Sequence, residues 1–429
     1  MKEKLYVFRE IKGVYQHVGA LSSAEEGVVF GYDPEYLTSD SPHCISLDLP
    51  LQQECFTPKR TRVFFEGLLP EGEMRELFAR LIRIEADDYI KLLSILNNET
   101  AGALVFSKDR EGPSQIRSYK PFTMENLKEF SRRPRSVALS VGMESRLSIA
   151  GAQTKLGLYH EGSNPLAGWF VPEGIAPSNA IIKCSDGLFP LQTINEGLCL
   201  TTAHHCELER GQCFFIPMDE GEPLLAVKRF DRIITSESPV VNGHRLPTRL
   251  HQEDLCQAAG ILSYLKYEPT DGNYLNLVAF LIARHSENPL EDRVTFFKRI
   301  LFDYVIGNCD NHLKNHSFLW KNDWSTCKLS PLYDITCTTM YPNLAREMGV
   351  SLCQSRRIDD VTKNDILVAA KKVGISERLG KVICAELADR FPSALRKAES
   401  EIAQQGIEQV SEVADPIADA AKKRMQIFG

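Results

Sequence analysis

One polar segment constrains this chain more than any other: residues 307–315 (GNCDNHLKN), which follow a long apolar stretch. Asp310 and Asn315 lie five positions apart in it, and Asp334 follows within LYDI at 332–335. Carboxylate and amide oxygens are ligands that Mg²⁺ prefers, and a carboxylate can also accept a proton from a hydroxyl group. The three residues therefore match the groups that phosphoryl transfer requires. The structural alternative is a polar turn after a helix, followed by a solvated aspartate.

The spacing of these residues is that of the protein-kinase loop H-R-D-x-x-x-x-N, in which the Asp acts as base and the Asn binds metal. Tyr333 and Ile335 frame Asp334, which stands where a kinase has the aspartate of its D-F-G motif. We therefore expect a catalytic base at Asp310 and Mg²⁺ ligands at Asn315 and Asp334.

The composition is that of an ordinary globular protein and argues against several other classes. The chain has 429 residues, of which 43% are hydrophobic and 25% charged, enough for about two or three domains. No apolar run approaches the roughly 20 residues that span a bilayer, and the N-terminus lacks a secretory signal. Twelve scattered cysteines without a C-x-x-C pair favour reduced thiols, so we expect a cytoplasmic protein. A net charge of −7 argues against non-specific binding to nucleic acid.

Patterning divides the chain into three parts. Residues 1–107 are rich in β-prone runs, and the charged stretch that follows, which ends in Gly-Pro, indicates a boundary. Residues 108–230 are mainly strands, and residues 231–429 are mainly helical. We expect an α+β chain with a two-lobed, protein-kinase-like fold. A β-rich N-terminal subdomain would be fused to an N-lobe with the ATP loop and hinge, and to a helical C-lobe with the catalytic loop.

Individual helices are also predicted from apolar periodicity. In the first part, residues 64–83 are expected to be helical, with Pro70 tolerated at a first turn, and residues 87–96 form a second amphipathic helix. In the third part, residues 275–283 and 294–306 carry continuous apolar faces that are typical of core helices.

A loop of small residues is the first candidate for phosphate binding, within RLSIAGAQTKLG at 146–157. The small side chains of Ala150, Gly151 and Ala152 would let main-chain N–H groups approach phosphate oxygens, and Lys155 would add a positive charge. The sequence is neither G-x-G-x-x-G nor a Walker A motif, so a simple hairpin turn between two strands is the alternative.

A second candidate is Lys183, which ends the apolar run AIIK at 180–183 and resembles the V-A-I-K strand of kinases. Glu196, on a predicted helix downstream, is its expected ion-pair partner. The alternative is a lysine at a strand edge whose apolar stem is buried and whose amine reaches water. Residues 228–230 (KRF) fall where a hinge between lobes would hydrogen-bond an adenine edge.

Several motifs together carry a resemblance to a known family. They occur in the family's order from the first strands to about residue 380: LLPEG at 68–72, AGALVF at 101–106, SIAGAQTK at 148–155, RLHQED at 249–254, GNCDNHLKN at 307–315 and LYD at 332–334. This combination resembles the HipA serine/threonine kinases, which are toxins of bacterial toxin–antitoxin pairs.

The resemblance implies roles for particular residues, with ATP and Mg²⁺ as cofactors. Asp310 would be the catalytic base, Asn315 and Asp334 would be the Mg²⁺ ligands, and Ser148 would be the serine that the family autophosphorylates. The residues implied to line the ATP site are Ala150, Gly151, Ala152, Gln153, Thr154, Lys155, Lys183, Lys228, Arg229, Phe230, His312, Leu313, Lys314, Asn315, Tyr333 and Asp334.

The resemblance also implies partners. These are a HipB-like antitoxin with a helix-turn-helix, operator DNA reached mainly through that antitoxin, and a protein substrate in translation such as an aminoacyl-tRNA synthetase. Two departures from the family are visible. The segment KKVGISER at 371–378 only loosely matches the family's basic contact region, which puts direct DNA contact in doubt, and Cys309 precedes the aspartate.

Two other classes of function remain open at this stage. The same scaffold could carry a small-molecule kinase, because lobes and metal ligands do not specify the acceptor. It could also be a catalytically idle corepressor that only binds. The presence of Asp310, Asn315, Asp334 and Lys183 together favours an active enzyme.

Overall fold

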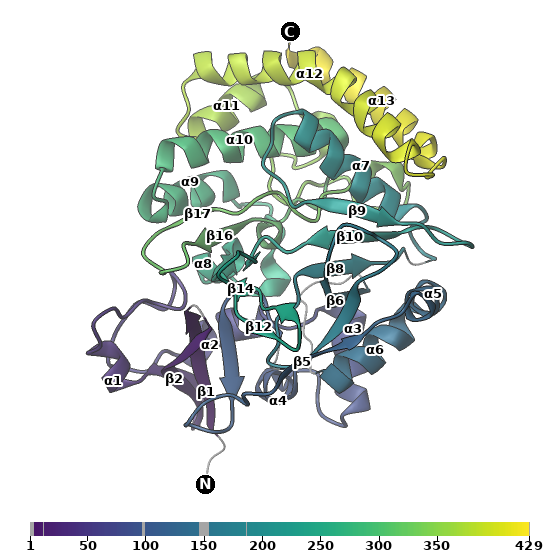
Figure 1. Ribbon diagram of the computed structural model, residues 1–429. Coiled ribbons are helices and arrows are strands. Elements are labelled where there is room, and N and C mark those ends of the chain that lie inside the picture. The colour runs from purple at the N-terminus through teal and green to yellow at the C-terminus, as the bar shows by residue number, and fades with distance from the viewer. Residues whose placement is uncertain (1–3, 12, 97–98, 146–153, 186, 429) are drawn as a thin grey trace. The chain divides into compact units, whose positions relative to one another are not determined.

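The chain begins with an antiparallel sheet whose first strand is mostly buried, as a computed structural model shows (Figure 1). The structure describes residues 4–11, 13–96, 99–145, 154–185 and 187–428. The chain forms two compact units that alternate along the sequence. Unit 1 comprises Met1–Cys184, Ala226–Ser263 and Leu319–Ser325, and unit 2 comprises Ser185–Leu225, Tyr264–Phe318 and Thr326–Gly429. The three-part division at residues 107 and 230 stays a prediction.

The first sheet of unit 1 has the strand order β3-β2-β1-β4. Its strands are β1 (Lys4–Ile11), β2 (Val14–Ala24), β3 (Gly27–Tyr32) and β4 (Leu104–Ser107). Between β3 and β4 the chain forms α1 (Pro34–Leu37), α2 (Pro58–Glu66), α3 (Gly72–Leu81) and α4 (Tyr89–Ile95). The ring of Phe30 on β3 packs against Phe56 and against Phe65 of α2, with ring centroids 6.1 and 5.3 Å apart, and this contact joins helix and sheet.

The helix predictions for this part are confirmed in one case and wrong in detail in the other. The helix expected over residues 87–96 is α4 (Tyr89–Ile95), whose first turn is capped by the carboxylate of Asp88. Residues 64–83 are not one helix, because α2 ends at Glu66 and α3 begins only at Gly72. Pro70 lies in the break between the two helices, where its lack of an N–H does no harm.

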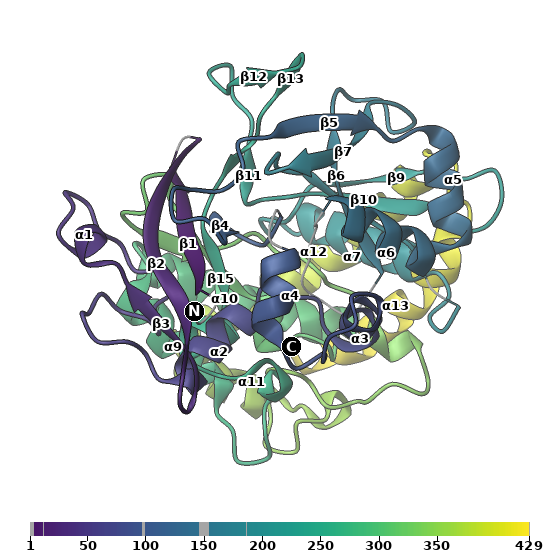
Figure 2. The same ribbon diagram turned by 90° about the horizontal axis from the view of Figure 1, so that it is seen from below.

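The second sheet of unit 1 carries the strands of the expected nucleotide lobe, in the order β5-β7-β6-β8-β10. These are β5 (Arg117–Pro121), β6 (Lys155–His160), β7 (Trp169–Gly174), β8 (Ala180–Lys183) and β10 (Leu224–Lys228), the last running from unit 2 into unit 1. The helices α5 (Met124–Arg132) and α6 (Pro134–Ser145) follow β5, and α6 packs beside β6 and β7 (Figure 2). Short pieces complete the unit: β11 (Arg232–Ile233), β12 (Val240–Val241), β13 (His244–Arg245), β14 (Thr248–Arg249), β15 (Gln252–Asp254) and α8 (Leu255–Ala259).

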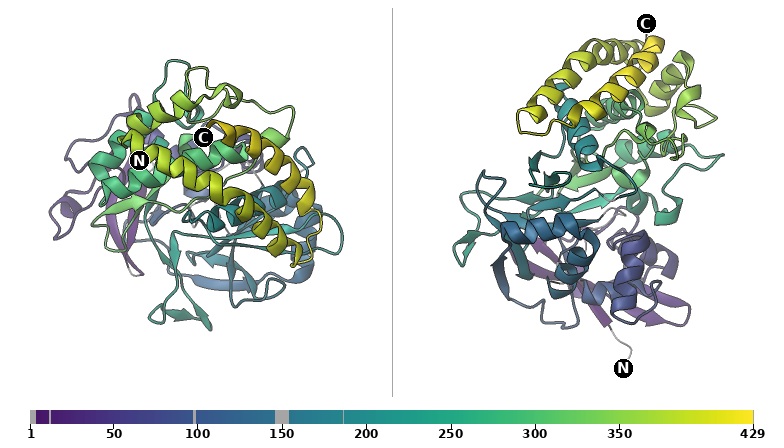
Figure 3. Two further views of the ribbon diagram at one scale, coloured as in Figure 1. Left: turned by 90° about the horizontal axis from the view of Figure 1, so that it is seen from above. Right: turned by 90° about the vertical axis from the view of Figure 1, so that its right-hand side faces the viewer.

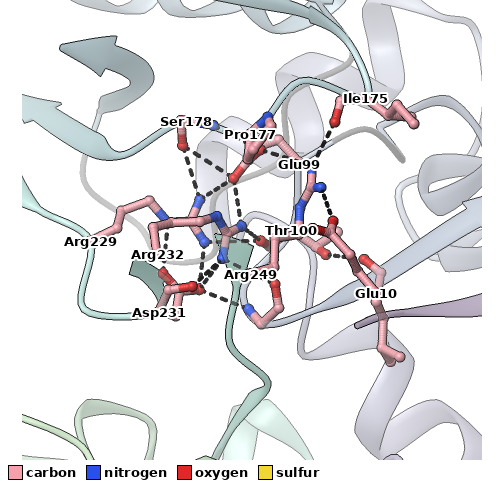
Figure 4. Close-up of polar contacts among 12 residues, drawn as sticks. Glu10, Glu99, Thr100, Ile175, Pro177, Ser178, Arg229, Asp231, Arg232 and Arg249 are labelled. Carbon is pink, nitrogen blue, oxygen red and sulfur yellow. Dashed lines mark hydrogen bonds and ion pairs between the residues drawn. The ribbon is translucent and has the colours of Figure 1, made fainter. Parts of the chain in front are cut away.

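A buried network of charged side chains holds distant segments of unit 1 together (Figure 4). The Glu99 carboxylate accepts hydrogen bonds from Arg229 and Arg232, at 2.5 and 2.7 Å. Both guanidinium groups also pair with Asp231, at 2.7 and 2.8 Å, and Arg249 lies 3.5 Å from Glu99. Because each charge has opposite charges and hydrogen bonds around it, the network can lie out of contact with water.

Unit 2 is mainly helical. Its helices are α7 (Gln192–His205), α9 (Tyr274–His285), α10 (Pro289–Ile306), α11 (Lys363–Val373), α12 (Glu377–Ala403) and α13 (Val410–Met425). The 3-10 turns of the chain are η1 (Ser263–Leu265), η2 (Leu313–Asn315), η3 (Thr338–Met340), η4 (Ile358–Asp360) and η5 (Gln426–Phe428). The strands are β9 (Cys213–Ile216), β17 (Cys327–Leu329) and the first half of β16 (Ser317–Trp320), whose last two residues belong to unit 1.

The long helix α12 packs along α7 and α13, as the views of the yellow helices in Figure 3 show. The predicted core helices 275–283 and 294–306 are confirmed as parts of α9 and α10, and α10 is buried along most of its last eleven residues. Among the described helices, none combines the length and the apolar character that crossing a membrane requires. No disulfide joins any of the twelve cysteines, all of which lie among the described residues.

Candidate active site

The predicted catalytic loop begins where α10 ends. Gly307 caps the helix with a φ of +85°, a left-handed conformation that favours glycine. A Cβ atom at this position would also collide with the side chains of Thr339 and Arg424. The glycine therefore turns the buried helix directly into the polar loop.

The buried carboxyl group of Asp303, on α10, fixes the start of this loop through Asn308. The Asn308 side chain donates to Asp303 Oδ1 at 2.8 Å, and its own oxygen accepts the main-chain N–H of Asp310 at 2.9 Å. The main-chain N–H of Cys309 donates to Thr338 Oγ1 at 2.8 Å. Burial raises the pKa of Asp303 to about 7, against a lowering effect of its hydrogen bond with Asn308. The main-chain N–H groups of Cys309 and Asp310 are thus each held by a side chain of unit 2.

The candidate base and the candidate metal ligand of the loop are brought together. Asn315 Nδ2 donates to the main-chain oxygen of Asp310 at 2.7 Å, and its main-chain N–H donates to His312 at 2.9 Å within η2. Because the amide nitrogen is engaged inside the loop, the amide oxygen remains for a cation. The Asp310 side chain is 48% exposed, so its carboxylate can be reached by another molecule.

The segment with Asp334 is attached to the same loop through its neighbour. The hydroxyl of Tyr333 donates to the main-chain oxygen of Lys314 at 2.8 Å and is 2.5 Å from Ser317 Oγ. Asp334 itself has a φ of +56°, which is uncommon for a residue other than glycine and costs on the order of 1–3 kcal/mol. Strained backbone of this kind is concentrated at functional sites, in agreement with a ligand role for Asp334.

In unit 1, two predicted lysines stand opposite each other. The register of β6 and β8 pairs Lys155 with Lys183, so their side chains leave the same face of the antiparallel pair. Lys183 is only 5% exposed. An anion bound at this face would be attracted by the positive charges of both lysines. The pair therefore fits the phosphates of a nucleotide, and Thr154, the buried residue before Lys155, lies at the same strand end.

Of the three residues predicted to form the hinge, Arg229 has a structural role instead. Lys228 ends β10 with an exposed side chain, and Phe230 follows as a half-buried residue. The guanidinium group of Arg229 belongs to the buried ionic network, and its main-chain N–H donates to Asn179 at 2.9 Å. Arg229 can therefore offer a ligand only its main-chain oxygen.

The remaining predicted site residues lie in separate parts of the chain. Glu196 is buried on α7 in unit 2, whereas Lys183 belongs to unit 1, so their pairing stays a prediction. His312, Leu313 and Lys314 are buried in the loop of unit 2. Ser148, Ala150, Gly151, Ala152 and Gln153 lie outside the described residues.

Sequence reasoning missed Tyr267, a residue in direct contact with the loop. Its hydroxyl donates a hydrogen bond to Asp310 Oδ1, and its ring meets the His312 ring edge to face, with centroids 5.0 Å apart. His312 Nε2 lies 3.9 Å from the same carboxylate oxygen. Tyr267 lies 43 positions before Asp310 in an unremarkable segment, so no local pattern could have indicated this contact.

Two family models match the chain. Residues 12–107 match the family model of the HipA N-terminal domain, and residues 147–395 match that of the HipA-like C-terminal domain. The chain is 28% identical over 421 residues to the protein Y4mE of Sinorhizobium fredii, covering 94% of this chain and 95% of that protein. It is 23% identical over 352 residues to the serine/threonine-protein kinase toxin HipA of Shewanella oneidensis, covering 79% and 77%.

A solved structure with the same fold comes from that organism. It contains HipA, HipB and their operator DNA, and one of its chains superposes with a TM-score of 0.81 at 20% identity, over 99% of this chain and 98% of that one. The predicted α+β, kinase-like fold and the predicted family are both confirmed. The chain belongs to the HipA family.

Proposed function

We propose that this chain is an ATP-dependent serine/threonine protein kinase of the toxin type. The observation that carries the proposal is the loop of unit 2, in which Asn315 is bonded to Asp310 while the Asp310 carboxylate stays accessible. Homology to a HipA named as a kinase toxin supports the same reading. Asn308 and Asn315 bond the main-chain N–H and the main-chain oxygen of Asp310, and so fix the residue whose carboxylate reaches solvent. A protein that only binds a partner would not need this arrangement.

Each of these residues would have its own role in the reaction. Asp310 accepts the proton of the acceptor hydroxyl while the acceptor oxygen bonds the γ-phosphorus and the bond to the bridging oxygen of ADP breaks. Asn315 and Asp334 would hold Mg²⁺ through their oxygens. When bound, Mg²⁺ neutralises negative charge on the phosphates. Lys155 and Lys183 add positive charge from the face of β6 and β8.

The acceptor class is tested by following label from γ-labelled ATP. Purified protein, Mg²⁺ and a dialysed bacterial lysate are incubated, and the products are separated into protein and small-molecule fractions. We expect the label on serine or threonine of proteins. Label confined to a small molecule would identify a small-molecule kinase on the same fold instead.

The proposed partners are inferred from the similar solved structure and not from the residues of the site. The Shewanella oneidensis structure contains HipA with HipB and operator DNA, which supports a HipB-like helix-turn-helix antitoxin here, with DNA reached mainly through it. We expect a protein substrate in translation, such as an aminoacyl-tRNA synthetase. Co-expression with a HipB-like helix-turn-helix protein should relieve growth inhibition by this chain and yield a stable complex.

Self-inactivation at Ser148 is the regulatory part of the proposal. A phosphate on Ser148 adds about −1.5 to −2 charges beside a loop that would bind nucleotide phosphates, so it should weaken ATP binding. Intact mass and peptide mapping after incubation with Mg-ATP test the modification. A Ser148-phosphorylated fraction that binds ATP as tightly as the unmodified protein would refute the inactivation.

A further inference from the structure

The main chain is held on both sides of Tyr267, and on one side the bond comes directly from the catalytic loop. Leu313 N–H donates to the oxygen of Lys266 at 3.2 Å, and the N–H of Glu268 donates to Gly349 at 2.9 Å. The buried Glu268 carboxylate also accepts hydrogen bonds from two main-chain N–H groups, at 2.9 and 2.7 Å. The position of the Tyr267 side chain is therefore set by the same unit that holds the loop.

The Tyr267 side chain lies on the accessible side of the candidate base. It is 46% exposed, and its hydroxyl donates to Oδ1 of Asp310, whose side chain is also about half exposed. The His312 ring meets the Tyr267 ring at an interplanar angle of 82°, and the amine of Lys266 lies 5.6 Å from the Tyr267 ring centroid. The ring is thus oriented from two sides while its outer surface stays open.

Stability alone does not account for this arrangement. A hydrogen bond between two half-exposed groups contributes little, because water can replace either partner. A carboxylate has two oxygens with several acceptor positions, and the rotation of its terminal torsion is broad. A donor on Oδ1 restricts that rotation, so the direction in which Oδ2 points is restricted as well.

We propose that Tyr267 is a positioning residue for phosphoryl transfer and one wall of the acceptor site. Its hydroxyl fixes the Asp310 carboxylate so that the second oxygen faces the serine or threonine hydroxyl of a protein acceptor. Its exposed ring packs against the residue beside that serine or threonine. The inference rests on the proposed kinase function and names a determinant of acceptor binding within it.

Three variants separate the two roles of Tyr267. Tyr267→Phe removes the hydroxyl and keeps the ring, and Tyr267→Ala removes both. Tyr264→Phe is the matched control, since Tyr264 belongs to the same segment and is 77% exposed. The probes are dephosphorylated casein and a peptide library with a central serine and randomised flanking positions, with nucleotide affinity measured separately by a fluorescent ATP analogue.

The proposal predicts a split between kinetic constants. Tyr267→Phe should lower kcat by about tenfold, because a misdirected base loses alignment with the acceptor, while KM for the peptides and nucleotide affinity stay unchanged. Tyr267→Ala should in addition raise KM for the peptides and change which flanking residues are preferred. Tyr264→Phe should match the wild type in all constants, and all three variants should keep the wild-type melting temperature.

Other outcomes overturn the inference. A Tyr267→Phe variant with wild-type or higher kcat would mean that the hydroxyl does not orient the base. A loss of activity that follows a lower melting temperature or weaker nucleotide binding would mean a merely structural role. Wild-type protein that labels neither casein nor peptides, nor itself, would instead refute the proposed function, which keeps the two failures distinct.

Discussion

Asn315 donates a hydrogen bond from its side-chain nitrogen to the main-chain oxygen of Asp310, with 2.7 Å between the two atoms. The bond closes the loop between the residue expected to take a proton and the residue expected to bind metal. It also orients the amide group of Asn315: the nitrogen bonds within the loop, and the oxygen points away from that bond. The two roles of the loop are therefore coupled through one side chain.

The first prediction separates these roles by substitution of Asn315. Asn315→Ala removes both the ligand oxygen and the internal donor, so the Mg²⁺ concentration for half-maximal activity should rise at least about tenfold. Asn315→Asp loses the donor and gains a negative charge but keeps an oxygen ligand, so it should need less added Mg²⁺ than Asn315→Ala. Titration of nucleotide binding with Mg²⁺ measures this. Equal Mg²⁺ dependence of both variants and the wild type would place the metal elsewhere.

The second prediction concerns the opposed lysines of β6 and β8. Lys155→Met should leave the ligand-free protein folded with a melting temperature near the wild-type value, because methionine keeps the apolar stem and removes only the charge on the strand position opposite Lys183. Nucleotide affinity should fall by about ten- to a hundredfold, the worth of a charge-assisted hydrogen bond. Thermal melting with and without Mg-ATP measures both effects. Undiminished stabilisation by ATP in the variant would exclude Lys155 from the nucleotide site.

The third prediction follows from the buried carboxyl of Asp303. Burial raises its pKa from 3.8 to about 7 in the folded state. Between these values the unfolded chain loses the proton and the folded protein keeps it, so the contribution of Asp303 to stability falls as pH rises from about 4 to 7. Asp303→Asn cannot ionise. Its melting temperature relative to the wild type should therefore increase from pH 5 to pH 8.

Asp271→Asn is the control for this pH dependence, because Asp271 is exposed. Its melting temperature should run parallel to that of the wild type over the same range. A constant difference between Asp303→Asn and the wild type from pH 5 to pH 8 would show that Asp303 does not titrate in this window.

The fourth prediction tests the buried network of unit 1. Burial raises the pKa of Glu99, but the charges of Arg232, Arg229 and Arg249 outweigh burial and hold the pKa below its usual value. Glu99→Gln would leave these guanidinium groups with too little negative charge, and should lower the free energy of unfolding by about 3–5 kcal/mol.

Urea unfolding followed by tryptophan fluorescence measures this change, since the three tryptophans of the chain all belong to unit 1. Glu76→Gln removes the partner of Arg80 in an exposed helix pair and should cost less than about 0.5 kcal/mol. Similar losses in the two variants would mean that the network does not stabilise the unit.

The sequence predicted those features that depend on neighbouring residues. Apolar periodicity located the core helix before the loop, and the spacing of Asp310 and Asn315 indicated that they act together. The break between α2 and α3 was missed, because a proline that is acceptable in a first turn can equally lie between two helices.

Features that depend on distant pairing could not be predicted. The register that sets Lys155 opposite Lys183 is a property of the sheet, and nothing in either strand alone specifies it. Arg229 was expected at a hinge, but one of the carboxylates that engage it, Glu99, lies 130 positions away in the chain. The contact of Tyr267 with Asp310 is equally non-local.

The central claim is that Asp310 is the base of a protein kinase, and single-turnover transfer from γ-labelled ATP tests it most directly. Wild-type protein and Asp310→Ala are each saturated with Mg-ATP, with nucleotide binding confirmed for both, and mixed with dephosphorylated casein. The account predicts transfer by the wild type and a rate lower by about 10²–10⁴-fold in the variant. Transfer by Asp310→Ala at the wild-type rate would contradict it.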